Sequence, residues 1–148
     1  MSCRQHKSTL LTAYTMKMTK LRDQKPTDGE LEILQILWQQ GPATVRQVNE
    51  QLDKDAGYTT TLKLMQIMLE KGLLKRDASS KVHIYEAAVG RDQTQDQLIK
   101  RMIDTVFNGS AMSLVMQALG NHKASSSEME QIRAYLEQAE KQRKKKTP

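Results

Sequence analysis

The residues best suited to chemistry lie on one side of a single predicted helix within residues 57–74. At about 100° per residue, that side carries short hydroxyls, an amide, an ammonium, a carboxylate and one apolar β-branched side chain. The side chains are those of Thr59, Thr60, Lys63, Gln66, Ile67 and Glu70. Hydroxyl, amide and ammonium groups can reach base edges and phosphates in a DNA major groove, and isoleucine can contact the methyl group of thymine. We expect the first five of these side chains to contact duplex DNA.

The opposite side of the same helix is almost entirely apolar and predicts a buried face. It consists of Thr61, Leu62, Leu64, Met65, Met68 and Leu69. Gly72 follows as a left-handed helix stop, and residues 73–77 and 81–86 are short β-type runs joined by small residues. A helix, a glycine stop and a basic hairpin are typical of a winged helix-turn-helix. In such a fold we expect Arg76 and Lys81 to contact the DNA backbone.

Two further helices are predicted before this one. Their starts are marked by the capping boxes Thr27 to Glu30 and Thr44 to Gln47. We interpret Trp38 as a core residue, because it recurs at helical spacing with leucines. Arg46 lies on the exposed side of the second helix, where helix-turn-helix proteins contact phosphates. A solvated surface arginine is an equally good interpretation.

The segment after Val89 predicts helices that cannot form a core of their own. Apolar residues recur there at spacings of three and four. Those expected to form a dimer interface are Leu98, Met102, Ile103, Val106, Phe107, Leu114, Val115, Ile132 and Leu136. A short helix should close at Gly120, and a last helix should begin at the capping box from Ser127 to Glu130. A set of helices that totals about 50 residues cannot enclose a core unaided, so we expect a second copy of the chain to cover their apolar faces.

Nothing in the sequence predicts catalysis, a metal or a cofactor. His6, His83 and His122 have no nucleophile or carboxylate at a spacing that suggests a shared site. His83 is interpreted as a wing surface residue, with a phosphate contact as the alternative. Cys3 is the single cysteine, which excludes an intramolecular disulfide. Neither a membrane span nor a signal peptide is visible, so we expect a cytoplasmic protein that is not an enzyme.

The net charge of +6 is unevenly distributed. Residues 1–25 hold six Lys or Arg and one Asp, and residues 141–148 hold five Lys or Arg and no acid. Basic tails are often only solubilising, so the local balance is more informative. Residues 56–85 hold five Lys or Arg against one Glu and one Asp, although the body between the tails is acidic overall. This polarity favours a DNA-binding surface at the helix and hairpin.

The fold class that follows is mainly α with a small β-hairpin, arranged as two domains between basic ends. We predict a disordered basic arm at 1–25, a winged-helix DNA-binding domain at 26–89, a helical dimerisation domain at 90–140 and a basic tail at 141–148. The arm can follow a minor groove or phosphates. The alternative is a plain extension, with translation starting at Met16 or Met18.

Four blocks of this sequence resemble the penicillinase and methicillin-resistance repressor family, which also includes copper-responsive repressors. They are the runs at 30–38, 41–48, 58–60 and 70–76, whose order and spacing match over about residues 26 to 140. The resemblance implies a dimeric bacterial repressor that binds inverted-repeat operators through its winged helix. It also implies a partner protease that inactivates the repressor by cleavage.

The chain departs from this family in three places. No cysteine follows Cys3, whereas copper-responsive members carry cysteine pairs near the C-terminus. At the place where antibiotic-responsive members are cleaved at an Asn-Phe bond, this chain has Gln117-Ala118. Lys63 and Ile67 stand where many members have Thr and Arg, so the operator sequence does not carry over.

The sequence therefore favours a homodimeric, sequence-specific repressor that binds double-stranded DNA. The alternative is a winged helix used as a protein interaction module, with Leu64 and Ile67 against a partner and Lys63 at the rim. The salt dependence of the binding affinity distinguishes the two functions. Contacts that neutralise phosphates release counterions and weaken as salt rises, whereas an apolar contact releases none.

Overall fold

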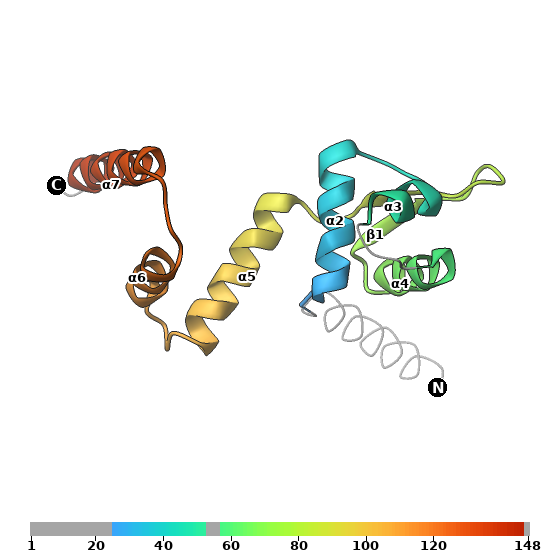
Figure 1. Ribbon diagram of the computed structural model, residues 1–148, viewed down its shortest axis with the longest axis horizontal. Coiled ribbons are helices and arrows are strands. Elements are labelled where there is room, and N and C mark those ends of the chain that lie inside the picture. Colours follow the sequence, from blue (N-terminus) through green and yellow to red (C-terminus); the bar gives the residue numbers. More distant parts are fainter. Residues whose placement is uncertain (1–24, 53–56, 147–148) are drawn as a thin grey trace, which may run out of the picture. The chain divides into compact units, whose positions relative to one another are not determined.

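The computed structural model describes residues 25–52 and 57–146 (Figure 1). The chain forms two compact units that divide between Leu98 and Ile99. The described residues contain six α-helices and one two-stranded antiparallel hairpin, as the sequence predicted. Apart from Lys25, the predicted basic arm lies outside the described residues, and so do residues 53–56 and 147–148.

The first two helices of the first unit begin where the sequence places their capping boxes. Helix α2 (Asp28–Gln40) is capped by Thr27, and helix α3 (Val45–Gln51) is capped by Thr44. In each case the threonine hydroxyl accepts the N–H of the third helical residue, and that residue's side chain accepts the threonine N–H. Both helix starts therefore follow from local sequence.

Helix α4 (Tyr58–Glu70) has differently built ends. At its start, Gly57 is the N-cap and makes no side-chain cap hydrogen bond. At its end, Gly72 has φ +78° and the Leu73 N–H donates to the Met68 carbonyl at 2.9 Å. The glycine stop predicted from the sequence is confirmed, because only the left-handed conformation allows this closing bond without strain.

The hairpin, which forms the wing, consists of β1 (Leu74–Asp77) and β2 (Ile84–Ala87). Leu74 pairs with Ala87 and Asp77 with Ile84. The second strand begins three residues after the start of the predicted run at 81–86, which corrects that prediction. The cause is the turn, because Asp77 Oδ1 accepts the Ser79 N–H and Ser80 Oγ donates to the Val82 carbonyl.

The core of the first unit joins the helices to the wing. Its buried residues are Ile33, Leu34, Leu37, Ala43, Val45, Val48, Met65, Met68, Leu73, Leu74 and Tyr85. Tyr85 of β2 also exchanges two backbone hydrogen bonds with Ala43, at 2.8 and 2.9 Å. Trp38 packs against this core, as predicted, and its Nε1 donates to the Val89 carbonyl at 2.8 Å. The wing is therefore fastened to the loop between α2 and α3.

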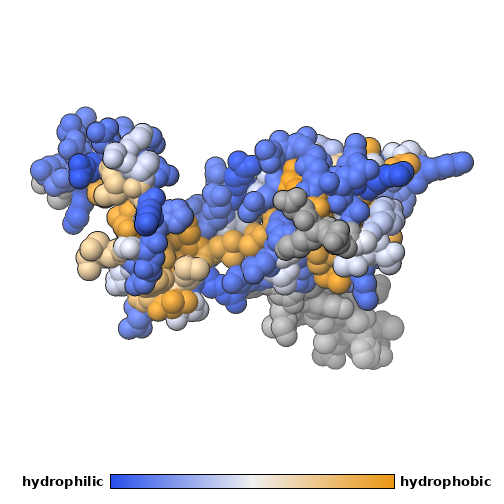
Figure 2. Space-filling view, viewed as in Figure 1, coloured by the Kyte–Doolittle hydropathy of each residue, from blue (hydrophilic) through white to orange (hydrophobic). Residues whose placement is uncertain are grey.

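Three helices follow the wing. Helix α5 (Arg91–Thr105) begins in the first unit, where Thr94 is buried. Helix α6 (Ala111–Asn121) and helix α7 (Ser126–Lys146) contain no buried residue. None of the described helices is long and apolar enough to cross a bilayer. Figure 2 shows apolar surface over α5 and α6.

Two predicted boundaries in the second unit are wrong. Gly120 does not close α6, because it lacks the positive φ of a left-handed stop and the helix continues to Asn121. The capping box of α7 is formed by Ser125 and Glu128 and not by Ser127 and Glu130. With Ser125 as the cap, α7 begins earlier than predicted and still has both hydrogen bonds of a capping box. At the other end, α7 runs into the predicted basic tail as far as Lys146.

Candidate nucleic-acid interface

The polar side of α4 faces solvent. Its five predicted contact residues, Thr59, Thr60, Lys63, Gln66 and Ile67, are all exposed. The opposite side is buried at Thr61, Met65 and Met68, so the division of the helix inferred from the sequence is confirmed. Ile67 is the one apolar residue among these five candidates, and it is 37% exposed.

Polar contacts hold α4 against α3 and α2. Thr61 Oγ1 donates to Asn49 Oδ1 of α3 at 2.7 Å, and Thr61 is 1% exposed. A buried hydroxyl needs such a partner, since burial without one costs about 1–3 kcal/mol. The contact therefore fixes the spacing between the two helices of the helix-turn-helix.

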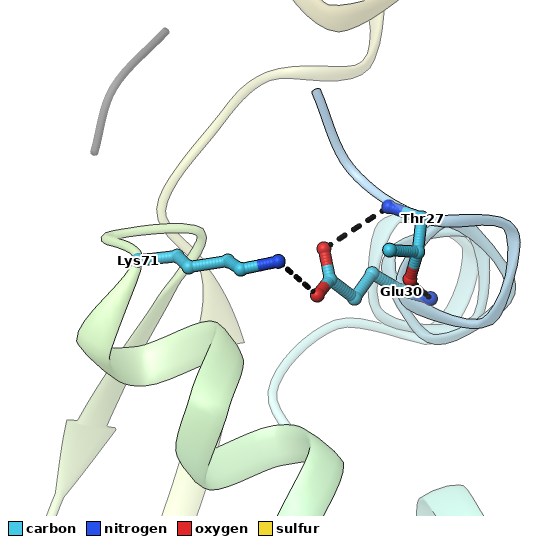
Figure 3. Close-up of polar contacts among 3 residues, drawn as sticks. All are labelled: Thr27, Glu30 and Lys71. Atoms are coloured by element: carbon cyan, nitrogen blue, oxygen red, sulfur yellow. Dashed lines mark hydrogen bonds and ion pairs between the residues drawn. The ribbon is translucent and has the colours of Figure 1, made fainter. Parts of the chain in front are cut away.

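The contact with α2 is an ion pair at the far end of α4. Lys71 Nζ lies 2.6 Å from Glu30 Oε1, and the other carboxylate oxygen accepts the Thr27 N–H at 3.1 Å (Figure 3). The side chain of Glu30 is 2% exposed and that of Lys71 is 20% exposed. The sequence indicated Glu30 only as part of a capping box and Lys71 only as a basic residue. The helical spacing of apolar residues in the sequence does not predict that these two side chains are in contact.

A cleft of about 800 Å³ lies between α3, the first turn of α4 and the wing. Its polar lining residues are Thr44, Arg46, Asn49, Glu50, Tyr58, Lys81, His83 and Tyr85. The structure thus brings together Arg46 and Lys81, two predicted phosphate ligands from different elements. Arg46 Nε lies 3.6 Å from Glu50 Oε1, and both side chains are largely exposed. Such a pair is weak, so the guanidinium is available to an incoming phosphate.

Other residues of the wing and of α4 complete this surface. Arg76 is exposed on β1, opposite Tyr85 in the strand register, and does not line the cleft. Tyr58 was not among the predicted contacts, although it is 51% exposed and lines the cleft. Its position as the first residue of a helix whose first turn is polar was the available signal.

The turn of the wing is held by a carboxylate. The backbone N–H of Ser79, with a further contribution from its side chain, lowers the pKa of Asp77. Hydrogen bonds to the charged form of a carboxyl group have this effect. The ionised Asp77 therefore favours the turn that carries Lys81 beside the cleft.

The predicted dimer residues are only partly covered by their own chain. Met102, Val106, Val115 and Leu136 are exposed. Leu98, Ile103, Phe107, Leu114 and Ile132 are partly buried. Within the part of the chain that the structure describes, no group of three His, Cys, Asp or Glu residues is placed to hold a metal ion.

Comparison with known proteins gives one family and several relatives. The family model described as penicillinase repressor matches residues 26–138. The penicillinase repressor of Bacillus licheniformis is 24% identical over 121 residues, 80% of this chain and 94% of that protein. The methicillin resistance regulatory protein MecI of Staphylococcus aureus (strain N315) is 26% identical over 112 residues, 74% of this chain and 91% of that protein. The solved structure of ZitR from Lactococcus lactis in apo form covers 96% of this chain and 98% of its own, with 17% identity and a TM-score of only 0.35.

Proposed function

The chain belongs to the penicillinase repressor family, and from that membership we propose that it represses transcription as a homodimer bound to inverted-repeat operators. The protein is a DNA-binding transcriptional repressor with a winged helix, and not an enzyme.

The exposed polar face of α4 is the observation that carries the proposal for DNA recognition. Thr59, Thr60, Lys63, Gln66 and Ile67 are exposed on a helix whose other side is buried. An α-helix fits the major groove, where hydroxyl, amide and ammonium groups meet base edges. We assign these five residues to base and phosphate contacts in each half-site.

The backbone contacts are assigned to the cleft and the wing. Arg46 and Lys81 line the same cleft beside α4, and Arg76 is exposed on β1. Phosphate contacts of this kind fix the register of a protein on the duplex without reading its sequence. Together with the base contacts of α4, they account for specific binding to one half-site.

The helices after the wing support a dimer. Residues 26–89 are proposed to bind DNA and residues 90–140 to dimerise. Met102, Val106, Val115 and Leu136 leave large apolar side chains in solvent, and no residue of α6 or α7 is buried. A helix face of this kind gains stability when a second copy covers it. Two winged helices joined in this way can read two half-sites.

We also propose that the repressor acts in the cytoplasm and that a signalling protease inactivates it. Gln117 and Ala118, which replace the family's Asn-Phe bond, are both exposed on α6. This peptide bond is accessible but helical, so a protease that requires an extended substrate has to unwind α6 locally. Mass spectrometry of the repressor from induced cells tests the proposal, and an intact chain during derepression contradicts it.

DNA binding can be tested against the alternative of a protein interaction module with the intact chain. The protein first selects duplexes from a randomised library, and the selected duplex is then titrated at several salt concentrations. We expect affinity to fall steeply as salt rises and an inverted repeat to be enriched. If no sequence is enriched and the affinity is insensitive to salt, the repressor proposal is wrong for this chain.

A further inference from the structure

We infer that the Glu30–Lys71 ion pair positions α4 for sequence reading, so that loss of the pair lowers operator selectivity in a protein that is still folded. This inference rests on the proposed function, because it concerns the helix assigned to base contacts. Its physical basis lies in Thr27, Glu30 and Lys71 (Figure 3).

The ion pair joins the ends of two helices. Lys71 is the C-cap of α4, and Glu30 is in the first turn of α2. The carboxylate of Glu30 has a second donor, the Thr27 N–H, which holds it in place on α2. With Glu30 fixed, the 2.6 Å contact to Lys71 Nζ restricts where α4 can end.

Within the part of the chain that the structure describes, the N-cap of α4 has no comparable side-chain anchor. Gly57 provides no side-chain cap, so no side chain of the N-cap residue fixes that end. Among residues 25–52 and 57–146, a second polar anchor of α4 is Thr61 with Asn49, one turn into the helix. Besides the core packing of Met65 and Met68, the position of the base-reading residues therefore depends on the polar contacts at Thr61 and Lys71.

Movement of α4 along its axis affects all base contacts together. Thr59 lies twelve residues before Lys71, about 18 Å along a helix, so a shift at one end is transmitted through a rigid element. Hydrogen bonds tolerate only a few tenths of an ångström, and a binding site loses function when displaced by about 1 Å. Phosphate contacts made by long lysine and arginine side chains tolerate more, since these side chains can adjust.

The ion pair adds a directional contact to the apolar packing of α4. The close packing of Met65 and Met68 already resists large shifts of the helix, and the pair adds a constraint between two particular atoms. A buried carboxylate that must satisfy two donors on different elements restricts the arrangement to one register. The carboxylate is nearly enclosed, because the Glu30 side chain is 2% exposed, whereas the Lys71 side chain is 20% exposed.

The test compares affinity for a duplex selected by the wild-type protein with affinity for a random duplex of equal length. The variants are Glu30→Gln and Lys71→Met in the full chain, studied at a temperature where circular dichroism shows each to be folded. Glutamine also serves in a capping box, so Glu30→Gln removes the charge and keeps the acceptor for Thr27. We expect the ratio of the two affinities to fall about fivefold or more, which is the loss of one base contact.

Three control variants separate positioning from stability and charge. Ile33→Val weakens the fully buried core of α2 without removing either partner of the ion pair and should leave the ratio unchanged. Lys100→Met removes one exposed cation from α5 and should also leave it unchanged. Lys71→Arg keeps a donor cation and should retain more of the ratio than Lys71→Met. If Lys71→Met does not fold, Glu30→Gln and Lys71→Arg still decide the question.

The outcomes distinguish this inference from the function on which it rests. A wild-type ratio in folded Glu30→Gln means that the pair serves stability alone and overturns the inference. An equal loss in Ile33→Val overturns it too, because the effect then follows stability. A wild-type protein that does not prefer any selected duplex overturns the proposed function itself.

Discussion

Truncating Ile67 to alanine should weaken binding at one base position in each half-site. Ile67 is 37% exposed on the polar face of α4, whereas the side chains of its buried neighbours Met65 and Met68 are enclosed. Its exposed part is available for a contact with the C5-methyl group of thymine. The deletion should therefore matter at sites that carry thymine at that position.

The size of the effect follows from the exposed fraction. Burying a whole isoleucine side chain is worth roughly 1.5–3 kcal/mol, so the 37% still open to a DNA partner is worth about 0.5–1 kcal/mol. A dimer makes this contact twice, which gives about 1–2 kcal/mol per operator or roughly 5- to 30-fold in affinity. The salt dependence should not change, because no phosphate contact is lost.

The assay is titration of wild type and Ile67→Ala against a library of half-site variants at two salt concentrations. Ile84→Ala is a matched control, since Ile84 is 41% exposed but lies on the wing strand β2. We expect Ile67→Ala to lose affinity only where thymine is present, and Ile84→Ala to change no base preference. An equal loss for every sequence, or a clear fall in melting temperature, would show that Ile67 is structural.

Four further predictions concern stability and assembly. Lys71→Met should lower the free energy of unfolding by about 3 kcal/mol, because it leaves an enclosed carboxylate without its cation. Glu30→Gln should lower it by only about 1 kcal/mol, because the lysine that loses its partner still reaches water. Equal losses in urea titrations would contradict this prediction. Trp38→Phe should cost about 1–2 kcal/mol in the same assay through the lost bond to the Val89 carbonyl, and no loss would show that bond to be without effect. Hydrogen bonds from Ser79 lower the pKa of Asp77 in the folded protein. The ionised carboxylate should therefore stabilise the wing turn at pH values above the ordinary pKa of aspartate, and this stabilisation should be lost as the pH falls through the lower pKa of the folded state. An NMR titration in which Asp77 has an ordinary midpoint would refute this prediction. The full chain should sediment as a dimer at micromolar concentration and a chain ending at Leu98 as a folded monomer, whereas a monomeric full chain would refute the dimer.

Features set by neighbouring residues were predictable from the sequence. The two faces of α4 follow from a local helical period, and the starts of α2 and α3 follow from the capping boxes at Thr27 and Thr44. Where one local pattern occurred twice, the prediction was wrong. Residues 125–127 are all serine, so both Ser125 and Ser127 precede a glutamate at capping distance, and the structure uses the first.

Contacts between distant residues were not predictable. Glu30 and Lys71 are 41 residues apart, and Trp38 is 51 residues from the carbonyl that it binds. Helical spacing identifies a face but not the atom opposite it, and the cleft between α3, α4 and the wing exists only once these elements are packed. The sequence therefore predicted Arg46 and Lys81 as two separate phosphate ligands, and the structure shows that both line the same cleft.

The proposal that this chain is a homodimeric repressor reading inverted repeats is tested most directly by one titration. The intact protein is added to its selected duplex at several salt concentrations, and the number of chains per duplex is measured by sedimentation. We predict two chains per duplex, affinity that falls linearly with salt on logarithmic axes, and much weaker binding to a random duplex. One chain per duplex, or equal affinity for both duplexes, would contradict the proposal.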